Sequence, residues 1–209
     1  MEKVICLELP WCQAGFYNAQ ESENITDAIK MNQVHSADCL YLTEKPVSSP
    51  FADALITDRA GLKLAVKTAD CAPILIADKE KHLVAAIHAG WKGAFQGVIE
   101  NTLLKMIQLG GNTKDMVAGI GPHLQKKSFE ISPDMRTLFP KTENHFFSEE
   151  NRKIYFDFDG YVIHRLHRAG IEKIESIKID TYSDLQYNSY RRDPENPKRQ
   201  LSIIEIKEV

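Results

Sequence analysis

The sequence has few cysteines, no excess of basic residues and no long apolar run. Its four cysteines include no Cys-x-x-Cys pair, which argues against a disulfide-rich scaffold. No apolar segment reaches the roughly 18 residues of a membrane-spanning helix, and residues 1–8 lack the features of a secretory signal. The formal net charge of −3 gives no electrostatic reason to expect nucleic acid or an anionic membrane. These absences favour a cytoplasmic protein that acts on small molecules.

What the sequence does contain is the composition of a folded globular domain. Hydrophobic residues make up 43% and charged residues 26% of its 209 residues. No linker, internal repeat or low-complexity tract divides the chain. We therefore expect a single domain that spans residues 1–209 and buries a substantial core.

Short apolar runs predict a β-sheet in the middle of the chain. The runs at residues 62–67, 72–77 and 83–87 are rich in Val, Ile and Leu and have the length of central strands. The charged break at residues 78–81 predicts a hairpin between the last two. Further strands are expected at residues 39–43, 54–57, 116–120, 154–158, 176–179 and 201–206.

Two segments have the period of an amphipathic helix. Apolar residues between positions 95 and 107 fall on one face of a helix that starts near Ala94 and stops at Gly110. A second helix is expected at residues 160–168, with Asp159 as its N-cap. Together with the strands, these helices give an α/β or α+β pattern.

Two parts of the chain have no such regular pattern. Apolar residues are scattered through residues 7–16, so the first quarter predicts little. The segment 191–199 is too charged and too rich in proline to be a packed strand, and we expect it to be a surface loop.

Three motifs each offer one metal ligand beside a predicted strand. They are Asn32-Gln33-Val34-His35, Thr68-Ala69-Asp70-Cys71-Ala72-Pro73 and His88-Ala89-Gly90-Trp91-Lys92-Gly93. Three protein ligands, here His35, Cys71 and His88, with a fourth position left open are typical of a catalytic zinc. The alternative is an inert cysteine and two ordinary polar histidines.

The glycine-rich turn after His88 has the features of an anion site. A strand, a turn and a helix start place backbone N–H groups and the positive end of a helix dipole beside His88, and Lys92 adds a full charge. The spacing is not that of a Walker A loop. The alternative is that the glycines only permit a sharp turn. Trp91 is equally suited to stack on a flat ring such as a purine or to anchor the core.

Two aspartates lie beside these motifs. Asp53, before the strand at residues 54–57, and Asp70, beside Cys71, are candidates for a general base or for orienting a histidine ligand. Either one is also suited to cap a turn.

The motifs, taken together and in order, resemble the bacterial laccase-domain family, called multicopper polyphenol oxidases in older usage. Purine nucleoside phosphorylases and peptidoglycan-editing factors belong to that family. The resemblance runs from about residue 32 to residue 206. The remaining motifs that carry it are Ala52-Asp53-Ala54-Leu55-Ile56-Thr57, Ile120-Gly121-Pro122, Phe129-Glu130 and Ser189-Tyr190-Arg191-Arg192.

The resemblance implies a mixed sheet flanked by helices and a metal held by His35, Cys71 and His88. Zinc is the expected metal, with copper possible. The implied activity is phosphorolysis of adenosine, inosine and methylthioadenosine, with some adenosine deamination. Purine nucleoside and phosphate, or a muropeptide, are then the expected small-molecule partners.

Site residues follow from the motifs and this chemistry. We expect catalytic roles for Cys71, Asp70 and Lys92, with Asp70 as proton donor and Lys92 beside the phosphate. Contacts to substrate are expected from four residues, which are Gln33, Trp91, Arg191 and Arg192; Arg191 or Arg192 would close over the substrate on a mobile loop.

The sequence departs from the family pattern at several positions. Lys92 stands where arginine is usual, which keeps the charge but loses a planar fork for bidentate anion contacts. His123 and Ser128 occupy a region where many members carry cysteines, and Asp180 stands where a late cysteine is often found. A multicopper cluster needs more soft ligands than these.

Other functions fit parts of the pattern. In a hydrolase, Cys71 would be the nucleophile and His88 its base, with the glycine-turn N–H groups stabilising an oxyanion. Such an enzyme could act on muropeptide precursors. A copper-dependent polyphenol oxidase and a non-catalytic module that binds a phosphorylated ligand are further alternatives.

Overall fold

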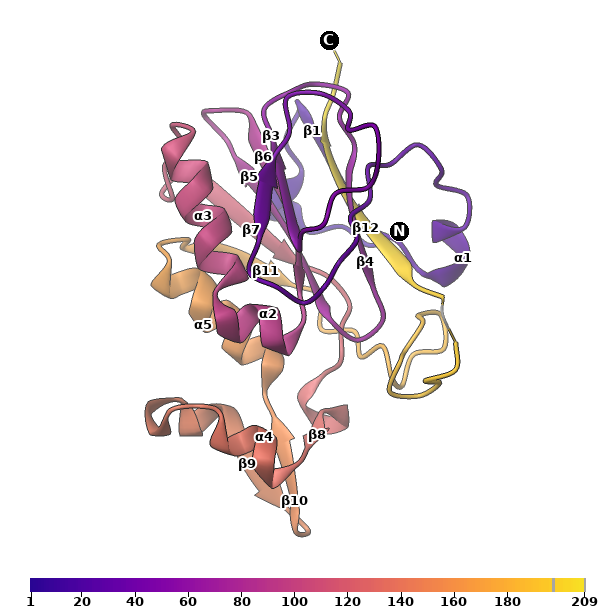
Figure 1. Cartoon of the computed structure of the whole chain (residues 1–209), viewed down its shortest axis with the longest axis vertical. Coiled ribbons are helices and arrows are strands. Elements are labelled where there is room, and N and C mark those ends of the chain that lie inside the picture. The colour runs from indigo at the N-terminus through magenta and orange to yellow at the C-terminus, as the bar shows by residue number, and fades with distance from the viewer. Residues whose placement is uncertain (197, 209) are drawn as a thin grey trace.

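The computed structural model describes residues 1–196 and 198–208. A six-stranded mixed sheet forms the centre of the molecule, in the order β11-β7-β5-β6-β3-β2 (Figure 1). Its strands are β11 Lys173–Ser176, β7 Met116–Ile120, β5 Ala72–Asp78, β6 Leu83–Ala89, β3 Ala54–Thr57 and β2 Cys39–Tyr41. The expected α+β fold with a mixed sheet and flanking helices is confirmed.

Strands β5 and β6 form the predicted hairpin at the middle of this sheet. Every residue of both strands is buried, as their unbroken apolar runs require. Asp78 ends β5, and its Oδ1 accepts hydrogen bonds from the backbone N–H groups of Glu80 and Lys81. These bonds fix the charged turn.

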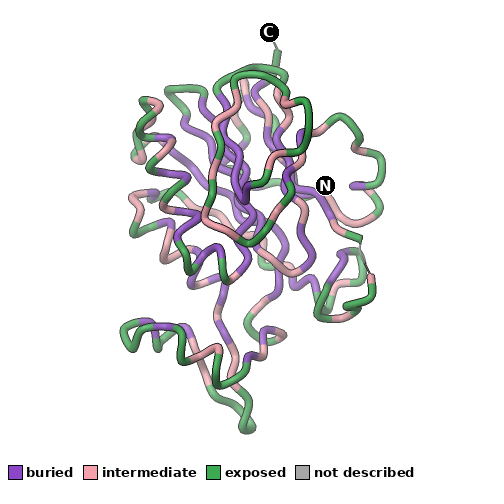
Figure 2. The backbone as a smooth tube through the Cα atoms, viewed as in Figure 1, coloured by how far each residue is buried: buried purple, intermediate pink, exposed green. Residues whose placement is uncertain are grey.

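Different layers cover the two faces of the central sheet. A three-stranded antiparallel sheet packs on one face, in the order β1 (Cys12–Phe16), β12 (Gln200–Ile206) and β4 (Leu64–Thr68). Leu55, Leu75 and Val84 point toward that sheet, whereas their sequence neighbours point toward helices α3 (Val98–Gln108) and α5 (Phe158–Arg168) on the other face. The purple backbone in Figure 2 marks this buried centre.

The first helix was predicted to be continuous, and this is wrong, because the segment forms two helices. They are α2 (Trp91–Gln96) and α3 (Val98–Gln108), separated by Gly97 with φ 100°. A left-handed residue cannot continue a right-handed helix, so the chain turns at this glycine. Phe95 and Ile107, which were expected on the buried face, are exposed.

The second predicted helix is confirmed, but its start is two residues earlier. Helix α5 runs from Phe158 to Arg168, and its N-cap is Asp157 rather than Asp159. The Asp157 side chain accepts the N–H of Gly160. Asp159 instead accepts a hydrogen bond from the Ser176 hydroxyl.

Residues 126–156 form a small lobe that projects from the main body (Figure 1). It contains a second three-stranded sheet, and aromatic residues pack inside it, Phe139 against both Phe147 and Phe156. Its elements are η2 Lys126–Ser128, β8 Glu130–Ile131, α4 Pro133–Thr137, η3 Lys141–Phe146, β9 Phe147–Glu150 and β10 Lys153–Phe156. The predicted strand at 154–158 therefore ends earlier, because the helix cap follows it.

The bounds of other elements also differ from those predicted. The strand expected at 176–179 lies at 173–176 as β11, where Glu175 accepts the backbone N–H groups of Ile5 and Cys6. Near the N-terminus the structure adds η1 Ile5–Leu7 and α1 Ala19–Ser22. Within the described part of the chain, no helix combines the length and the apolar character needed to cross a bilayer.

Candidate metal site and cavity

The register of the central sheet brings three sequence motifs to one edge. Strand β6 ends after His88 and runs antiparallel to both β3 and β5, with His88 opposite Pro73 and Ile87 opposite Ala54. The residues just before β3 and β5 therefore lie beside His88. They are Asp53 and Cys71, which are 35 and 17 positions away in the sequence.

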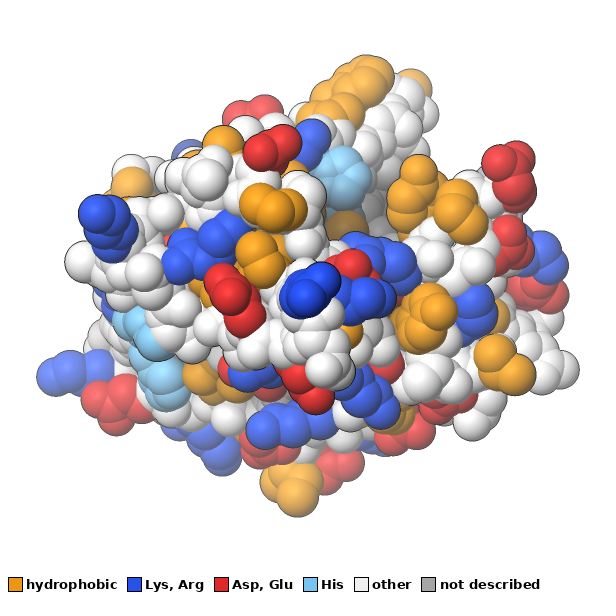
Figure 3. Space-filling model, turned by 90° about the horizontal axis from the view of Figure 1, so that it is seen from below, with side chains coloured by type: hydrophobic (Ala, Val, Ile, Leu, Met, Phe, Trp, Pro, Cys, Tyr) orange, Lys and Arg blue, Asp and Glu red, His pale blue; other side chains and the backbone are white. Residues whose placement is uncertain are grey.

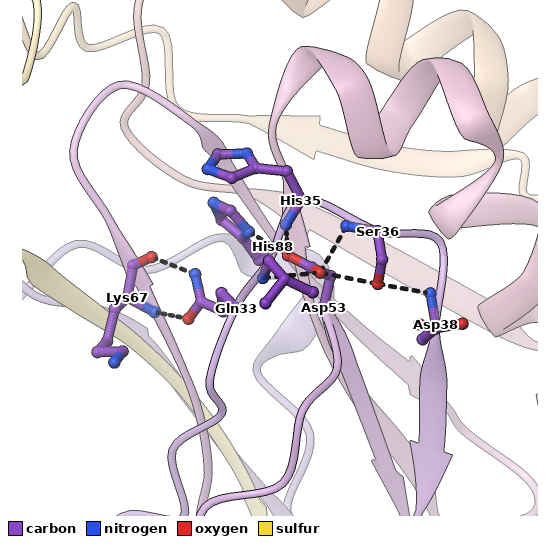
Figure 4. A network of polar contacts seen from close by, with 8 residues as sticks. Gln33, His35, Ser36, Asp38, Asp53, Lys67 and His88 are labelled. Atoms are coloured by element: carbon purple, nitrogen blue, oxygen red, sulfur yellow. Dashed lines mark hydrogen bonds and ion pairs between the residues drawn. The ribbon is translucent and has the colours of Figure 1, made fainter.

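Asp53 fixes both histidines of the candidate site (Figure 4). Its side chain is fully buried, and its Oδ1 lies 2.7 Å from Nδ1 of His88. The same carboxylate accepts the backbone N–H groups of Val34, His35 and Ser36, at 2.7 to 3.2 Å, and the Ser36 hydroxyl. Because Nδ1 of His88 donates to the carboxylate, its Nε2 is left free to bind a metal.

Two glycines let the loop that carries His35 approach helix α2. His35 adopts a left-handed conformation, with φ 59°. A Cβ at Gly90 would lie 2.5 Å from Nδ1 of His35 and 3.2 Å from Sγ of Cys71. A Cβ at Gly93 would lie 2.8 Å from the Ser36 carbonyl oxygen. The sequence favours glycine here because the backbone has to pass close to the ligands.

The three predicted ligands converge as expected. One donor atom each from His35, Cys71 and His88 lies within 4.8 Å of the others. Zinc binds sulfur at about 2.3 Å and imidazole nitrogen at about 2.0 to 2.1 Å, so small side-chain rotations would bring all three onto one ion. In residues 1–196 and 198–208 this is the one group of three or more such side chains close enough to share a metal. The donor set fits zinc.

The charges around His88 reinforce this arrangement. Burial lowers the pKa of His88, but Cys71 and the hydrogen bond to Asp53 more than offset this and raise the pKa to about 9. Burial raises the pKa of Asp53, but its hydrogen bonds to His88 and to the Ser36 backbone outweigh this and lower the pKa to about 2. Without a metal, the pair is therefore an imidazolium and a carboxylate. A proton and a metal compete for Nε2.

A cavity of about 840 Å³ opens above the three ligands. It lies where the main body, the small lobe and the loop before β12 meet. One wall is apolar, formed mainly by the lobe and by residues that lead into it and out of it; these residues are Leu124, Phe129, Ile131, Met135 and Phe158. Such a wall suits a flat organic ring.

Four positive side chains also line the cavity, against two carboxylates, Asp70 and Glu130. The positive side chains are Lys67, Lys92, Arg191 and Arg199, and in the described part of the chain none has a carboxylate within 4 Å of its charged group. Figure 3 shows a face of the molecule on which Lys and Arg side chains gather beside hydrophobic ones. A local excess of unpaired cations in a protein of net charge −3 indicates an anionic ligand.

The structure places most of the sequence-predicted site residues at this cavity. Trp91 and Lys92 line it from α2, and the Lys92 Nζ lies 5.6 Å from the centre of the Trp91 ring. Gln33 also lines it, but its amide is paired with the backbone N–H and C=O of Lys67. Its predicted contact with substrate therefore stays a prediction.

Asp70 and the two arginines have structural contacts that the sequence did not indicate. Both oxygens of Asp70 accept hydrogen bonds, Oδ1 from the Thr181 hydroxyl and Oδ2 from the backbone N–H of Arg191. Arg191 reaches the lobe, where its Nη1 donates to the Glu130 carbonyl. Arg192 donates to three backbone carbonyls between residues 181 and 187 and does not line the cavity.

Sequence reasoning overlooked Lys67, Arg199 and the apolar wall. Lys67 ends an apolar run that also contains Lys63, and its place at the end of the run, just before the Cys71 motif, was the available signal. Arg199 lies in a charged segment where nothing distinguishes it from its neighbours.

Comparison with known proteins agrees with this geometry. The model of the multi-copper polyphenol oxidoreductase laccase family matches residues 16–207. The chain belongs to this family. A purine nucleoside phosphorylase of Rickettsia prowazekii is 35% identical over 192 residues, which cover 87% of this chain and 79% of the relative. The purine nucleoside phosphorylase YfiH of Escherichia coli is 34% identical over 167 residues, covering 78% and 68%.

Solved structures of the family share the fold. Bacillus licheniformis YfiH aligns with a TM-score of 0.79 at 27% identity and covers 87% of this chain and 74% of that one. YlmD from Geobacillus stearothermophilus aligns with a TM-score of 0.79 at 26% identity, with the same coverage. The expected family is thus confirmed, and names of relatives indicate an enzyme of the purine nucleoside phosphorylase type.

Proposed function

We propose that this protein is a zinc-dependent enzyme that cleaves purine nucleosides with phosphate. Adenosine, inosine and methylthioadenosine are the proposed substrates, with adenosine deamination as a second reaction. The observation that supports the proposal is that three side chains able to hold a metal line a cavity that has one apolar wall and several unpaired cations. The apolar wall suits a purine ring, and the unpaired cations suit phosphate.

The proposed reaction exchanges one bond for another at the sugar. An oxygen of phosphate forms a bond to C1′ of the ribose while the bond from C1′ to the purine nitrogen breaks. The electron pair of that bond goes to the purine, which takes up a proton from solvent in the open cavity. The products are the free base and ribose 1-phosphate, or 5-methylthioribose 1-phosphate when the substrate is methylthioadenosine. A zinc ion held by His35, Cys71 and His88 would supply Lewis-acid stabilisation of negative charge.

The chain's own residues would position the reactants. The aromatic and aliphatic side chains of the lobe exclude water from one side of the base, and Trp91 lines the cavity near Lys92. Asp70 would act by holding the backbone of Arg191, because both of its carboxylate oxygens already accept hydrogen bonds. This role replaces direct proton donation by Asp70 in the proposal.

The direct test is metal analysis of the purified protein joined to a product screen by mass spectrometry. We expect about one zinc per chain, together with ribose 1-phosphate and free base from adenosine or inosine, but only when phosphate is present. A protein that holds zinc but forms neither ribose 1-phosphate nor free base would contradict the proposal, whether or not it converts adenosine to inosine.

One observation favours a second candidate, a thiol hydrolase that acts on muropeptide precursors. The Cys71 thiol, the His88 imidazole and the Asp53 carboxylate lie in the order of a nucleophile, a base and an orienting acid. His35 has no part in that arrangement, whereas the zinc site uses it.

Chelation separates the two candidates. A zinc enzyme loses turnover when a strong chelator removes the metal, and regains it when zinc is added back. The thiol hydrolase would keep turnover after chelation, and a thiol-reactive probe would label Cys71 in the active protein and stop it.

A further inference from the structure

Two of the cavity's cations come from strands on the face of the central sheet opposite to α2. Lys67 lies in β4, and Arg199 directly precedes β12. Strand β12 pairs with β4, with Leu201 opposite Lys67 and Gln200 opposite Thr68. Figure 1 shows these two strands on the other side of the central sheet from α2, which carries Lys92.

Lys67 and Arg199 line the same cavity from two paired strands. Lys67 pairs with Leu201 in the ladder, and Arg199 lies two residues before Leu201, just outside the paired part of β12. Two like charges that share one cavity repel each other, and an anion bound between them would relieve that repulsion.

The local contacts fix the Lys67 backbone and one nitrogen of Arg199, and they neutralise neither charge. The Gln33 amide fixes the Lys67 backbone, as Figure 4 shows. Nη1 of Arg199 donates to the carbonyls of Asn196 and Lys198. Among the described residues, the Lys67 ammonium and the Nε and Nη2 groups of Arg199 have no hydrogen-bond partner. These donors remain available to a ligand.

Arg199 lines the same cavity as the three candidate metal ligands, His35, Cys71 and His88. An anion held by Arg199 would therefore share this cavity with the ion that they would bind.

We propose that Lys67 and Arg199 together bind the phosphate co-substrate, on the β4 and β12 side of the cavity. This inference rests on the proposed phosphorolysis, and it assigns phosphate to residues other than Lys92. The planar guanidinium of Arg199 presents two parallel donors, a geometry that matches a phosphate oxyanion. Lys67 adds a second charge from the neighbouring strand.

Steady-state kinetics of the zinc-loaded enzyme test this assignment. Arg199→Gln should raise the KM for phosphate by about tenfold or more, and Lys67→Gln should raise it by a smaller factor. The KM for inosine and the zinc content should stay within about twofold of wild type. The matched control is Lys198→Gln, which removes the same charge one position away, where the ammonium pairs with Glu23 at 2.9 Å in solvent.

A binding measurement supports the kinetics. Calorimetric titration of the zinc-loaded protein with inorganic phosphate should show binding that weakens in Arg199→Gln and Lys67→Gln but not in Lys198→Gln. If Arg199→Gln loses its zinc or its folded structure, Arg199→Lys and Lys67→Gln carry the same expectation, with smaller factors.

The outcomes separate this inference from the proposed function. Phosphorolysis by the wild type, with an unchanged KM for phosphate in Arg199→Gln and Lys67→Gln, overturns the assignment and leaves the function standing. An increase confined to Lys92→Gln overturns it in the same way. A zinc-loaded wild type that carries out no phosphorolysis overturns the proposed function, and the phosphate assignment with it.

Discussion

The base of the cavity and its rim differ in how their polar groups are held. At the base, Asp53 accepts five hydrogen bonds and fixes His88 together with the loop of His35. At the rim, Lys67 and Lys92 have no carboxylate partner in the part of the chain that the structure describes. Fixed donors suit a resident ion, whereas unpaired cations suit a ligand that arrives and leaves. The comparison supports the proposal that the base holds a metal and the rim binds an anionic substrate.

The largest expected effect comes from removing the sulfur at the base. Cys71→Ala should abolish both zinc binding and turnover, because two histidines alone leave the ion without its thiolate ligand. Zinc content by atomic spectroscopy and product formation by mass spectrometry measure this. The control is Cys39→Ala, which alters a half-buried thiol in β2 outside the cavity. Normal turnover by Cys71→Ala would discard the zinc site.

A smaller effect is expected from the carboxylate behind the ligands. Asp53→Asn weakens the acceptor for His88 and for three backbone N–H groups, so zinc affinity should fall by about 10- to 100-fold. Competition with a chromogenic zinc chelator gives the affinity. Asp38→Asn, an exposed change on the same loop, should leave it unchanged. Equal zinc affinity in wild type and Asp53→Asn would show that the base does not depend on this network.

Two glycines separate effects on the site from effects on the fold. Gly90→Ala places a methyl group 2.5 Å from His35 Nδ1, so zinc binding should be lost with little change in melting temperature. Gly97→Ala instead forces alanine to φ 100°, where the nearest atom is 3.7 Å away. That variant should keep its zinc and lose about 1 to 2 kcal/mol of stability. If Gly90→Ala kept its zinc while Gly97→Ala lost it, the close approach of Gly90 to His35 would not matter for metal binding.

The smallest effect concerns thiol reactivity. Burial raises the pKa of both Cys6 and Cys12 to about 12, so at pH 8 these thiols stay protonated and unreactive. In native, zinc-free protein, an alkylating reagent should modify Cys71 first, and added zinc should protect it. Mass spectrometry of the labelled peptides gives the order. Early labelling of Cys6 or Cys12 would show that the core opens more easily than its packing indicates.

Much of the fold could be predicted because hydrophobic periodicity is local. The β5–β6 hairpin follows from two apolar runs with a charged break between them. The predicted start of helix α5 is two residues too late, because aspartate is a good N-cap at either position 157 or position 159. The end of β10 at Phe156 decides in favour of Asp157. The break at Gly97 was missed because an apolar face continues across it.

Some residues of the candidate site could likewise be predicted from the sequence, and others could not. His35, Cys71 and His88 could be named from ligand chemistry and motif resemblance, and they do converge. Lys67 and Arg199 could not, because their proximity depends on the pairing of two strands about 130 residues apart in sequence.

The sequence by itself determined the types of ligand, the strands that carry them and the family of the chain, because these depend on short segments and their composition. Tertiary structure decided which aspartate supports the histidines, which residues form the apolar wall and where unpaired charge gathers. Those features depend on strand register and on the packing of distant segments, and no single stretch of the chain contains that information.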